Sequence, residues 1–241
     1  MAKRRIDSLL VDRGLVESRA KAQALIMAGE VVVNGKAAIK PGTLVAEEVA
    51  ITLLEPPPFV GRGGLKLDYA LDKFQLDVSS KVVADIGAST GGFTDCLLKR
   101  GASRVYAIDV GYGQLDYRLR QDRRVVVMER VNARYPISLT EKVDLATMDL
   151  SFISVEKVIP SVAQLLKDSG YLLVLIKPQF EARRDEVGKG GIVKQPQVHA
   201  RVLGRFIAWM IDHGFRLGGL VASPILGASG NREFFALLRL T

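Results

Sequence analysis

Residues that form disulfides and metal centres are almost missing from this chain of 241 residues. It has one cysteine, Cys96, and two histidines, His199 and His213. One cysteine cannot form an internal disulfide, and these three side chains make no recognisable metal-binding motif. Cys96 lies within an apolar segment that follows a glycine turn, which favours a packed core residue. The sequence therefore indicates neither a metal centre nor a cysteine nucleophile.

Long apolar runs are also missing. No stretch approaches the roughly 20 consecutive apolar residues that a membrane-spanning helix needs. The first residues, Met1-Ala2-Lys3-Arg4-Arg5, lead into an amphipathic segment instead of the apolar core of a secretion signal. We therefore expect a cytoplasmic protein that is not embedded in a membrane.

Acidic residues are outnumbered by basic ones. The chain has 34 Lys and Arg against 26 Asp and Glu, a formal net charge of +8. Such an excess favours an anionic partner, most simply a nucleic acid. Residues 1–40 hold eight of the basic residues and four acidic ones, so half of the excess lies in about a sixth of the chain. We expect the nucleic acid to bind there.

The stretch from Val82 to Phe93 reads V-V-A-D-I-G-A-S-T-G-G-F and predicts a strand, a glycine turn and a helix. Glycines let the backbone approach a ligand, and the first N–H groups of a helix offer donors and positive charge. The order G-x-x-x-G-G differs from the dinucleotide fingerprint G-x-G-x-x-G, which argues against a pyrophosphate ligand. A plain connecting turn is the alternative.

Two aspartates at strand ends favour S-adenosylmethionine as the ligand. Asp85 ends the first strand and suits the ammonium group of the methionine moiety, and Asp109 ends the next strand and suits the ribose hydroxyls. A strand-end carboxylate is costly to bury without such a partner. The residues expected to contact the cofactor are Asp85, Gly87, Ala88, Ser89, Thr90, Gly91, Gly92, Phe93, Asp109, Val110, Asp149 and Phe152.

From residue 61 to residue 241, strands alternate with helical patterns. The expected strands cover residues 82–86, 104–108, 125–128, 143–148, 171–176, 220–222 and 234–240. This order predicts an α/β fold, a Rossmann-like class I methyltransferase with a mostly parallel sheet and an antiparallel last strand. Ligands bind beyond the carboxyl ends of such strands. Asp149 and Lys177 each follow an apolar strand directly, so we interpret them as site residues and not as solvated strand ends.

Residues 1–54 predict a separate small α+β domain. Two short helices end at Gly14 and Gly29, Asn34-Gly35 is typical of a tight hairpin turn, and further strands are expected near residues 43–45 and 49–53. The prolines at 56–58 predict an extended linker over residues 55–60, because each fixes φ and disfavours helix before it. The larger domain then spans residues 61–241.

The segment S-R-A-K-A-Q-A-L-I-M-A-G-E-V-V-V-N-G-K, residues 18–36, resembles the RNA-binding S-four domain, named after a small-subunit ribosomal protein. That resemblance implies RNA contact by the second helix and the hairpin; the residues concerned are Arg4, Arg5, Arg19, Lys21, Gln23, Asn34 and Lys36. A solvated helix face is the alternative. Arg62, in the glycine-rich entry to the next helix, is a further candidate for RNA phosphate, the alternative being a flexible joint.

Methyl transfer to a hydroxyl group requires the acceptor to be held behind the methyl group and to lose its proton. A lysine that lies beside a second cation gives up its own proton more readily and can then help to remove that of a ribose hydroxyl. We expect Lys66 and Lys177 to form such a pair, with Asp149 orienting Lys177 and Glu233 orienting Lys66.

Six motifs resemble those of the TlyA family, called rRNA 2′-O-methyltransferases and also haemolysins, whose catalytic domain is similar to FtsJ-type enzymes. They are G-R-G-G-L-K-L, D-I-G-A-S-T-G-G-F-T-D, I-D-V-G, M-D-L-S-F-I-S, I-K-P-Q-F-E and G-N-R-E-F, and the resemblance spans nearly the whole chain. It implies a Lys-Asp-Lys-Glu tetrad, here Lys66, Asp149, Lys177 and Glu233. It also implies methylation of cytidine ribose in ribosomal RNA, with rRNA or ribosomal subunits as partners.

Other functions fit the sequence less well. Asp149-Leu150-Ser151-Phe152 lacks the two prolines of exocyclic-amine methyltransferases and the cysteine that a carbon methyltransferase would place there. A membrane-lytic protein is disfavoured, because no apolar amphipathic segment is long enough. A non-catalytic RNA-binding or ribosome-assembly factor is the remaining alternative, since a fold can persist without turnover. The intact tetrad favours the enzyme.

Overall fold

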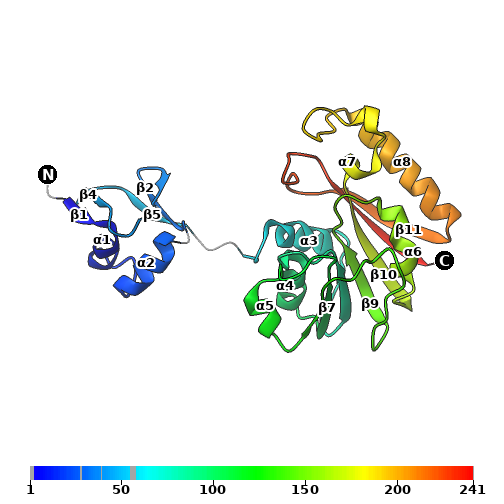
Figure 1. The fold of residues 1–241 in the computed structure, drawn as a ribbon, viewed down its shortest axis with the longest axis horizontal. Helices are drawn as coiled ribbons and strands as arrows, with labels where there is room; N and C mark the ends of the chain where they lie inside the picture. Colours follow the sequence, from blue (N-terminus) through cyan, green and yellow to red (C-terminus); the bar gives the residue numbers. More distant parts are fainter. Residues whose placement is uncertain (1–2, 28, 39, 55–57, 241) are drawn as a thin grey trace. The chain divides into compact units, whose positions relative to one another are not determined.

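The residues described by this computed structural model, 3–27, 29–38, 40–54 and 58–240, divide between two units (Figure 1). The division lies between Pro57 and Pro58. Residues 55–57 of the predicted linker lie outside the described residues. Residues 58–60 belong to the second unit, where Val60 N donates to Asp95 Oδ2 (2.9 Å) and Pro58 O accepts from Lys99 Nζ (2.6 Å).

The first unit combines two helices with short strands. The helices are α1 (Ile6–Asp12) and α2 (Arg19–Met27), and the strands are β1 (Lys3–Arg5), β2 (Val31–Val33), β3 (Lys36–Ala37), β4 (Leu44–Ala46) and β5 (Ile51–Leu53). Strand β2 pairs with β3 and β5, and β1 pairs with β4, all antiparallel. A core of Ile6, Leu10, Ala22, Ile26, Val31 and Ala38 holds these elements together.

Local sequence signals explain most of this unit. Asn34 and Gly35 both have positive φ (48° and 77°), as a two-residue hairpin turn requires. Ser18 Oγ accepts a hydrogen bond from Lys21 N (3.2 Å) at the start of α2, as a helix N-cap does. The two helices and the hairpin are therefore present as predicted. Strand β1 was not predicted, because its three exposed basic residues carry no alternating pattern.

The second unit is built on a seven-stranded sheet. Its strands are β6 (Val82–Ile86), β7 (Arg104–Ile108), β8 (Val125–Met128), β9 (Val143–Met148), β10 (Leu166–Ile176), β11 (Phe215–Ala222) and β12 (Phe234–Leu240), in the order β11-β12-β10-β9-β6-β7-β8. Pairing is parallel from β8 to β10, whereas β12 runs antiparallel to both β10 and β11. This confirms the predicted fold class.

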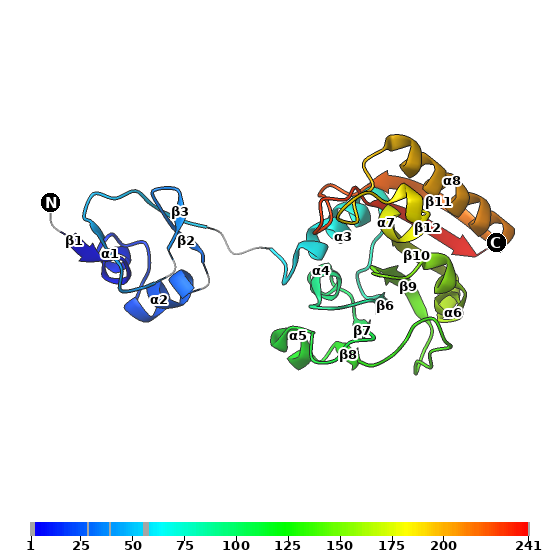
Figure 2. The same cartoon turned by 45° about the horizontal axis from the view of Figure 1, so that its top comes forward.

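Helices cover both faces of this sheet (Figure 2). The α-helices of this unit are α3 (Arg62–Lys73), α4 (Gly92–Lys99), α5 (Tyr117–Gln121), α6 (Ile159–Ala163), α7 (Pro178–Glu181) and α8 (Pro196–Asp212). One core joins the sheet to α3, α4 and α5, and the other joins it to α6 and α8. Among the described residues, no helix combines the length and apolar character needed to cross a membrane.

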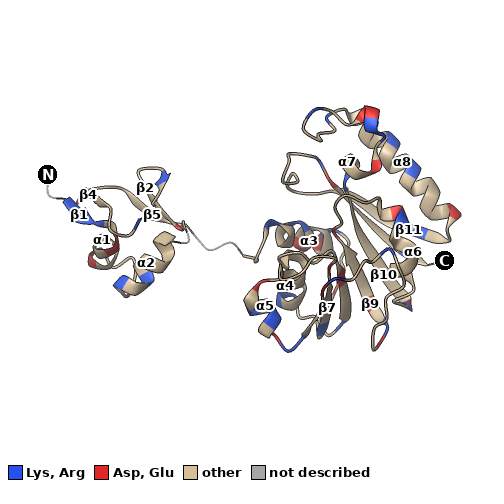
Figure 3. Cartoon of the chain, viewed as in Figure 1, with Lys and Arg blue, Asp and Glu red and all other residues tan. Residues whose placement is uncertain are grey.

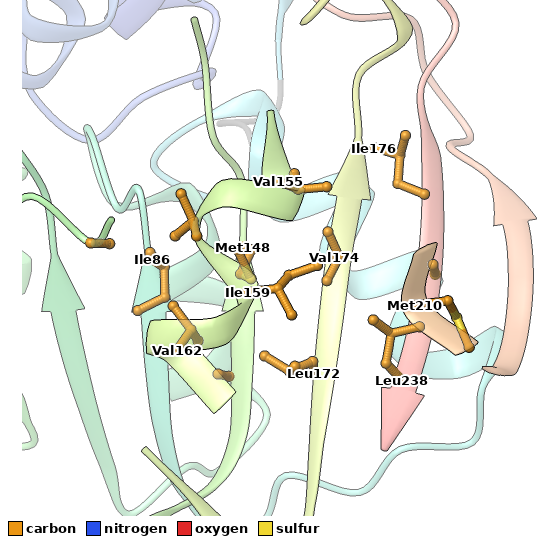
Figure 4. Close-up of a cluster of buried hydrophobic side chains, with 14 of the residues drawn as sticks. Ile86, Met148, Val155, Ile159, Val162, Leu172, Val174, Ile176, Met210 and Leu238 are labelled. Carbon is orange, nitrogen blue, oxygen red and sulfur yellow. The ribbon is translucent and has the colours of Figure 1, made fainter. Parts of the chain in front are cut away.

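Successive side chains of a strand point to opposite faces of the sheet and so pack into different cores. Val83 packs with the α3 and α4 side, whereas Ala84 and Ile86 pack with the α6 and α8 side, as the two-residue period of a strand requires. Figure 4 shows the second core, where Ile86, Met148 and Val174 come from three strands and lie near Ile159 and Val162 of α6. Because both faces are covered, the strands read as continuous apolar runs.

Two strands are longer than the sequence indicated. Strand β10 begins at Leu166 and not at Tyr171, and its register with β9 shifts between these residues. Strand β11 begins at Phe215, five residues before the expected start, and passes through Gly218 and Gly219. Polar side chains in the first case and glycines in the second hide the strand pattern.

The order of the strands gathers several carboxyl ends at one edge of the sheet. The chain leaves the central strand β6 toward β7 and β8 and later returns on the other side of β6 to β9 and β10. The crevice where the direction of winding reverses, between β6 and β9, is the usual ligand site of such sheets. The glycine turn, Asp149 and Lys177 follow these strands directly.

We predict that Phe235→Ala lowers the free energy of unfolding by about 3–5 kcal/mol, the usual cost of truncating a buried aromatic ring. Phe235 is 0% exposed and stacks on Phe93 with ring centroids 6.1 Å apart. Phe152→Ala is the control, because this ring is 91% exposed; it should change stability by less than about 0.5 kcal/mol. Urea denaturation followed by circular dichroism measures both, and equal losses would contradict the core position of Phe235.

Candidate active site

A buried ion pair joins helix α3 to the start of strand β12, which are far apart in the chain. Lys66 on α3 places its Nζ 2.6 Å from Glu233 Oε2, and Glu233 directly precedes β12. The two residues are only 7% and 3% exposed. A charge buried to this degree needs an opposite charge beside it, and each residue supplies one to the other. The pairing of Lys66 with Glu233 expected from the sequence is present.

A second ion pair lies at the ends of β9 and β10. Lys177 Nζ is 2.6 Å from Asp149 Oδ1, and Lys177 also donates a hydrogen bond to Ser151 Oγ (3.1 Å). The side chains are 12% and 20% exposed, so this pair is more accessible than the first. Among the described residues, none donates a hydrogen bond of normal geometry to Asp149 Oδ1. That oxygen is buried, and its described partner is the charge of Lys177.

The first turn of α3 lies between the two pairs. A Cβ atom at Gly63 would be 3.9 Å from Asp149 Oδ2, while Lys66 is three residues further along the same helix. Arg62 Nη2 donates to Leu226 O (3.0 Å), in the loop that leads to Glu233. The first turn of α3 therefore lies near Asp149 through Gly63 and contacts Glu233 through Lys66. Arg62, which was predicted to bind RNA, joins the loop before Glu233 to α3.

A cavity of about 490 Å³ opens next to Asp149, within the size range of small-molecule sites. Of the twelve residues predicted to contact the cofactor, six line it: Gly87, Ser89, Asp109, Val110, Asp149 and Phe152. Sequence reasoning missed Gln114, Leu150 and the segment from Val131 to Arg134. That segment begins three residues after β8, behind Glu129 and Arg130, and its position after the third parallel strand was a usable signal.

The wall of the cavity fits a nucleoside-like ligand. Asp109 accepts hydrogen bonds from Ser89 N (2.8 Å) and Gly111 N (2.6 Å), which fix a carboxylate that still has lone pairs for ribose hydroxyls. Gly87 has φ +84°, and a Cβ atom there would lie 2.5 Å from Asp149 O. Only glycine allows this close approach. Apolar side chains complete the lining: Ile86, Ile108, Val131, Ile153 and Val158.

The later residues of the glycine turn serve packing and lie outside the cavity wall. Gly91 has φ +98°, and a Cβ atom there would lie 2.2 Å from Leu119 Cδ1 on α5. Gly92 lies against the backbone of α3, where its Cβ position would be 3.1 Å from Gly64 N. Phe93 is 3% exposed, Ala88 is also buried, and Thr90 is exposed away from the wall.

Asp85 also lies outside the cavity wall. Its carboxylate is 0% exposed and accepts hydrogen bonds from Thr94 Oγ1 (2.7 Å) and Thr147 Oγ1 (3.2 Å). Burial raises the pKa of Asp85 to about 7, against the opposing effect of these two hydrogen bonds. Direct contact with the ammonium group of a cofactor, as the sequence suggested, does not fit this placement. Two threonines from α4 and β9 already satisfy the carboxyl group.

Strained backbone occurs at the rim of the cavity. Ser89 and Phe152 both have positive φ, 49° and 65°. Such conformations cost on the order of 1–3 kcal/mol for a non-glycine residue and cluster at functional sites. The Phe152 ring is 91% exposed and lies near Phe180, with ring centroids 5.1 Å apart. Phe152 therefore presents an aromatic face to solvent beside the Lys177 and Asp149 pair.

The first unit gathers basic side chains on β1 and α2 (Figure 3). Arg5, Arg19 and Gln23 all donate hydrogen bonds to one carboxylate, that of Asp7. Arg4 pairs with Asp12 (2.8 Å) and with Glu47 (3.4 Å). Lys21 and Lys36 have no ion-pair partner among the described residues, and Asn34 occupies the hairpin turn. The predicted RNA-binding residues thus differ in how firmly they are held.

Both units match known families. Residues 59–240 match the FtsJ-like methyltransferase family, and residues 4–51 match the S4 domain family. A Bacillus subtilis protein provisionally named the rRNA methyltransferase YqxC is 50% identical over 236 residues, which cover 96% of this chain and 84% of that protein.

Two further similarities extend over the whole chain. The 16S/23S rRNA (cytidine-2′-O)-methyltransferase TlyA of Mycobacterium tuberculosis is 45% identical over 244 residues, covering 99% of this chain and 91% of that protein. A solved structure from Streptococcus thermophilus, provisionally described as a hemolysin, is 45% identical with a TM-score of 0.76 and covers 100% of this chain and 90% of its own.

The raised pKa of Asp85 predicts a stability that falls with increasing pH. Between about pH 4 and pH 7 the unfolded chain releases this proton while the native chain retains it, so the native state loses stability as the pH rises. Asp85→Asn removes this penalty. The advantage of the variant over the wild type should therefore grow by on the order of 4 kcal/mol from pH 4 to pH 8.

Urea denaturation at pH 4, 6 and 8 measures this difference. Asp116→Asn is the control, since hydrogen bonding to Arg118 lowers the pKa of Asp116 and its contribution is complete above the ordinary carboxyl range. Its difference from the wild type should be the same at pH 6 and at pH 8. A constant difference for Asp85→Asn as well would show that Asp85 is ionised throughout.

Proposed function

The chain belongs to the FtsJ-like methyltransferase family, and from this membership we propose that it transfers a methyl group from S-adenosylmethionine to a ribose 2′-hydroxyl of ribosomal RNA. The observation that carries the proposal is the ion pair of Lys177 with Asp149, because Asp149 also lines a cavity of the size of small-molecule sites. The names of the relatives support a cytidine ribose as acceptor. The formal net charge of +8 suits rRNA, free or within a ribosomal subunit, as partner.

S-adenosylmethionine, when bound, supplies an electrophilic methyl group. The residues that would hold it are those that line the cavity: Asp109 at the ribose hydroxyls, Gly87 and Ser89 through the backbone, and the segment from Val131 to Arg134 on the far wall. The apolar lining shields the base from water. Asp85 lies outside the cavity wall and links α4 to β9, because it accepts hydrogen bonds from Thr94 and Thr147.

Lys177 is the group that takes up or shares the proton of the acceptor hydroxyl. Its ammonium form is fixed by Asp149 and Ser151, so its Nζ is held in one place at the ends of β9 and β10. A lysine Nζ held at this point would accept the hydroxyl proton, and Asp149 would stabilise the ammonium group that results.

Lys66 and Glu233 complete the tetrad as a more deeply buried pair. The positive charge of Lys66 stabilises the oxyanion that develops on the acceptor, and Glu233 holds Lys66 in place (2.6 Å). Preorganised charge in a site shielded from water lowers the barrier more than mobile charge in water does. The exposed Phe152 ring offers a face on which an RNA base can stack.

Lys177→Ala should reduce methyl transfer at least about a hundredfold, the lower end of what loss of a positioned general base costs. Binding of S-adenosylmethionine should change less than threefold, because Lys177 does not line the cavity. Transfer of labelled methyl to purified ribosomal subunits and to naked rRNA, followed by nucleoside analysis, measures the reaction, and calorimetry measures the cofactor.

Lys167→Ala is the matched control for this experiment. Lys167 lies on the same strand, β10, at its opposite end, where it pairs with Asp144 (2.8 Å). It should retain wild-type transfer. The label should be recovered as a 2′-O-methylated nucleoside. Near wild-type transfer by Lys177→Ala would remove Lys177 from the proposed role, and label on a base instead of a ribose would replace the proposed reaction.

Removal of residues 1–57 should weaken binding to rRNA and flatten its dependence on salt, because the eight Lys and Arg side chains of this segment leave with it. Cofactor binding should persist, since the cavity is lined entirely by residues of the second unit. Filter binding at several KCl concentrations measures the slope. An unchanged slope would assign RNA binding to the second unit.

A further inference from the structure

The first unit contains a carboxylate with an unusual number of donors. Asp7, in the first turn of α1, is 0% exposed. Its Oδ1 accepts from Arg5 Nε (3.0 Å) and Ser8 N (2.9 Å). Its Oδ2 accepts from Arg5 Nη2 (2.7 Å), Arg19 Nε (3.1 Å) and Gln23 Nε2 (3.0 Å). Three side chains expected to bind RNA therefore converge on one buried residue.

The two arginines keep most of their donors for another ligand. A guanidinium group has five N–H donors in a fixed plane. Arg5 directs Nε and Nη2 to Asp7, and Arg19 directs only Nε. Their side chains are 44% and 54% exposed. Each guanidinium group is thus held by part of its donors, while its side chain stays about half exposed.

A backbone contact fixes Arg5 further. A Cβ atom at Gly42 would lie 3.2 Å from Arg5 Nη1 and 3.4 Å from its Cζ, so the guanidinium group packs directly against this glycine. Asp7 N donates to Pro41 O (3.2 Å), which ties the start of α1 to the same loop. The carboxylate, the glycine and both arginines therefore form one ordered cluster, built from β1, α1, α2 and the loop at residues 41–43.

We propose that Asp7 is a positioning residue for RNA binding, which aligns the free N–H donors of Arg5 and Arg19 toward the phosphates of the rRNA backbone. Arginine donors match phosphate oxygens in a fork geometry, provided that the guanidinium plane is correctly turned. Ordering long side chains before binding reduces the entropy lost on binding. This inference rests on the proposed function, because it takes rRNA as the ligand.

Because Asp7 is negatively charged, its removal should change RNA affinity in opposite directions under electrostatics alone and under positioning. Hydrogen bonds from Arg5, Gln23 and Arg19 hold the pKa of Asp7 well below its usual range, so it is an anion at neutral pH. Removing an anion makes the chain more positive, and electrostatics alone then predicts tighter binding to RNA. Positioning predicts the opposite, weaker binding, because both guanidinium groups lose their anchor.

The experiment compares full-length wild type and Asp7→Asn for binding to purified bacterial 16S and 23S rRNA over a range of KCl concentrations. We expect at least tenfold weaker binding by Asp7→Asn and a slope of log K against log salt that is shallower by about one to two. In the methyl-transfer assay the loss should fall on KM for rRNA, with kcat at saturating rRNA within twofold. The affinity for S-adenosylmethionine should stay the same.

Asp12→Asn is the matched control. Asp12 ends the same helix, is 42% exposed and pairs with Arg4, so its substitution removes the same charge without touching the cluster. It should bind rRNA as tightly as the wild type or up to about threefold more tightly, the direction expected from charge alone. If Asp7→Asn follows this control, Asp7 does not position the arginines and the proposal is wrong.

A second variant keeps the test decisive if Asp7→Asn fails to fold. Gly42→Val leaves every charge in place and puts a side chain where the Arg5 guanidinium group packs. We expect at least threefold weaker rRNA binding with an unchanged thermal melting profile. Wild-type affinity of a folded Gly42→Val, whatever the state of Asp7→Asn, would overturn the proposal.

The double variant Arg5→Ala/Arg19→Ala separates this proposal from the proposed function. If it binds rRNA like the wild type while methyl transfer continues, these arginines do not contact the RNA. The proposed role of Asp7 is then wrong, while the proposed function stands. If the wild type neither binds nor methylates rRNA, the proposed function fails as well. Loss of binding in the double variant, together with loss in Asp7→Asn, supports both.

Discussion

The site depends on how closely three parallel strands approach one another at their carboxyl ends. Gly87 N donates to Ile108 O (2.8 Å), and Asp149 N donates to Ile86 O (3.0 Å), so the backbone that follows β6 is tied to β7 on one side and β9 on the other. A side chain at Gly87 would collide with Asp149 O. This constraint sets Asp109 and Asp149 on either side of the cavity, and the remaining site is built outward from it.

The charges of the site are arranged by depth. Lys66 and Glu233 are almost completely buried and pair with each other, so both side chains are held in fixed positions. Lys177 and Asp149 are partly exposed, where a substrate can reach them. Asp85 lies deeper than both, and burial there favours the neutral acid over the anion. The buried pair thus stays in place, while the more exposed pair of Lys177 and Asp149 can exchange a proton with a substrate.

The sequence predicted the features that depend on local or periodic signals. The parallel strands, the glycine turn and the Asn34-Gly35 hairpin follow from such signals, and both lysine–carboxylate contacts are present as expected. It could not separate Gly87, which shapes the cavity, from Gly91 and Gly92, which allow close helix packing, because that difference depends on α3 and α5. It also missed the threonine partners of Asp85 and the donors that converge on Asp7, since neither follows from spacing along the chain.

The position of β12 has a consequence for synthesis of the chain. This strand lies between β10 and β11 in the sheet although it follows both in sequence, and the partner of Lys66 stands just before it. Lys66 is made 167 residues earlier than Glu233 and has no such counterion until the last strand inserts. A nascent chain can form β6 to β9 while it is still being translated, since folding proceeds from the N-terminal side. It cannot form the ion pair between Lys66 and Glu233 until residue 233 has left the ribosome.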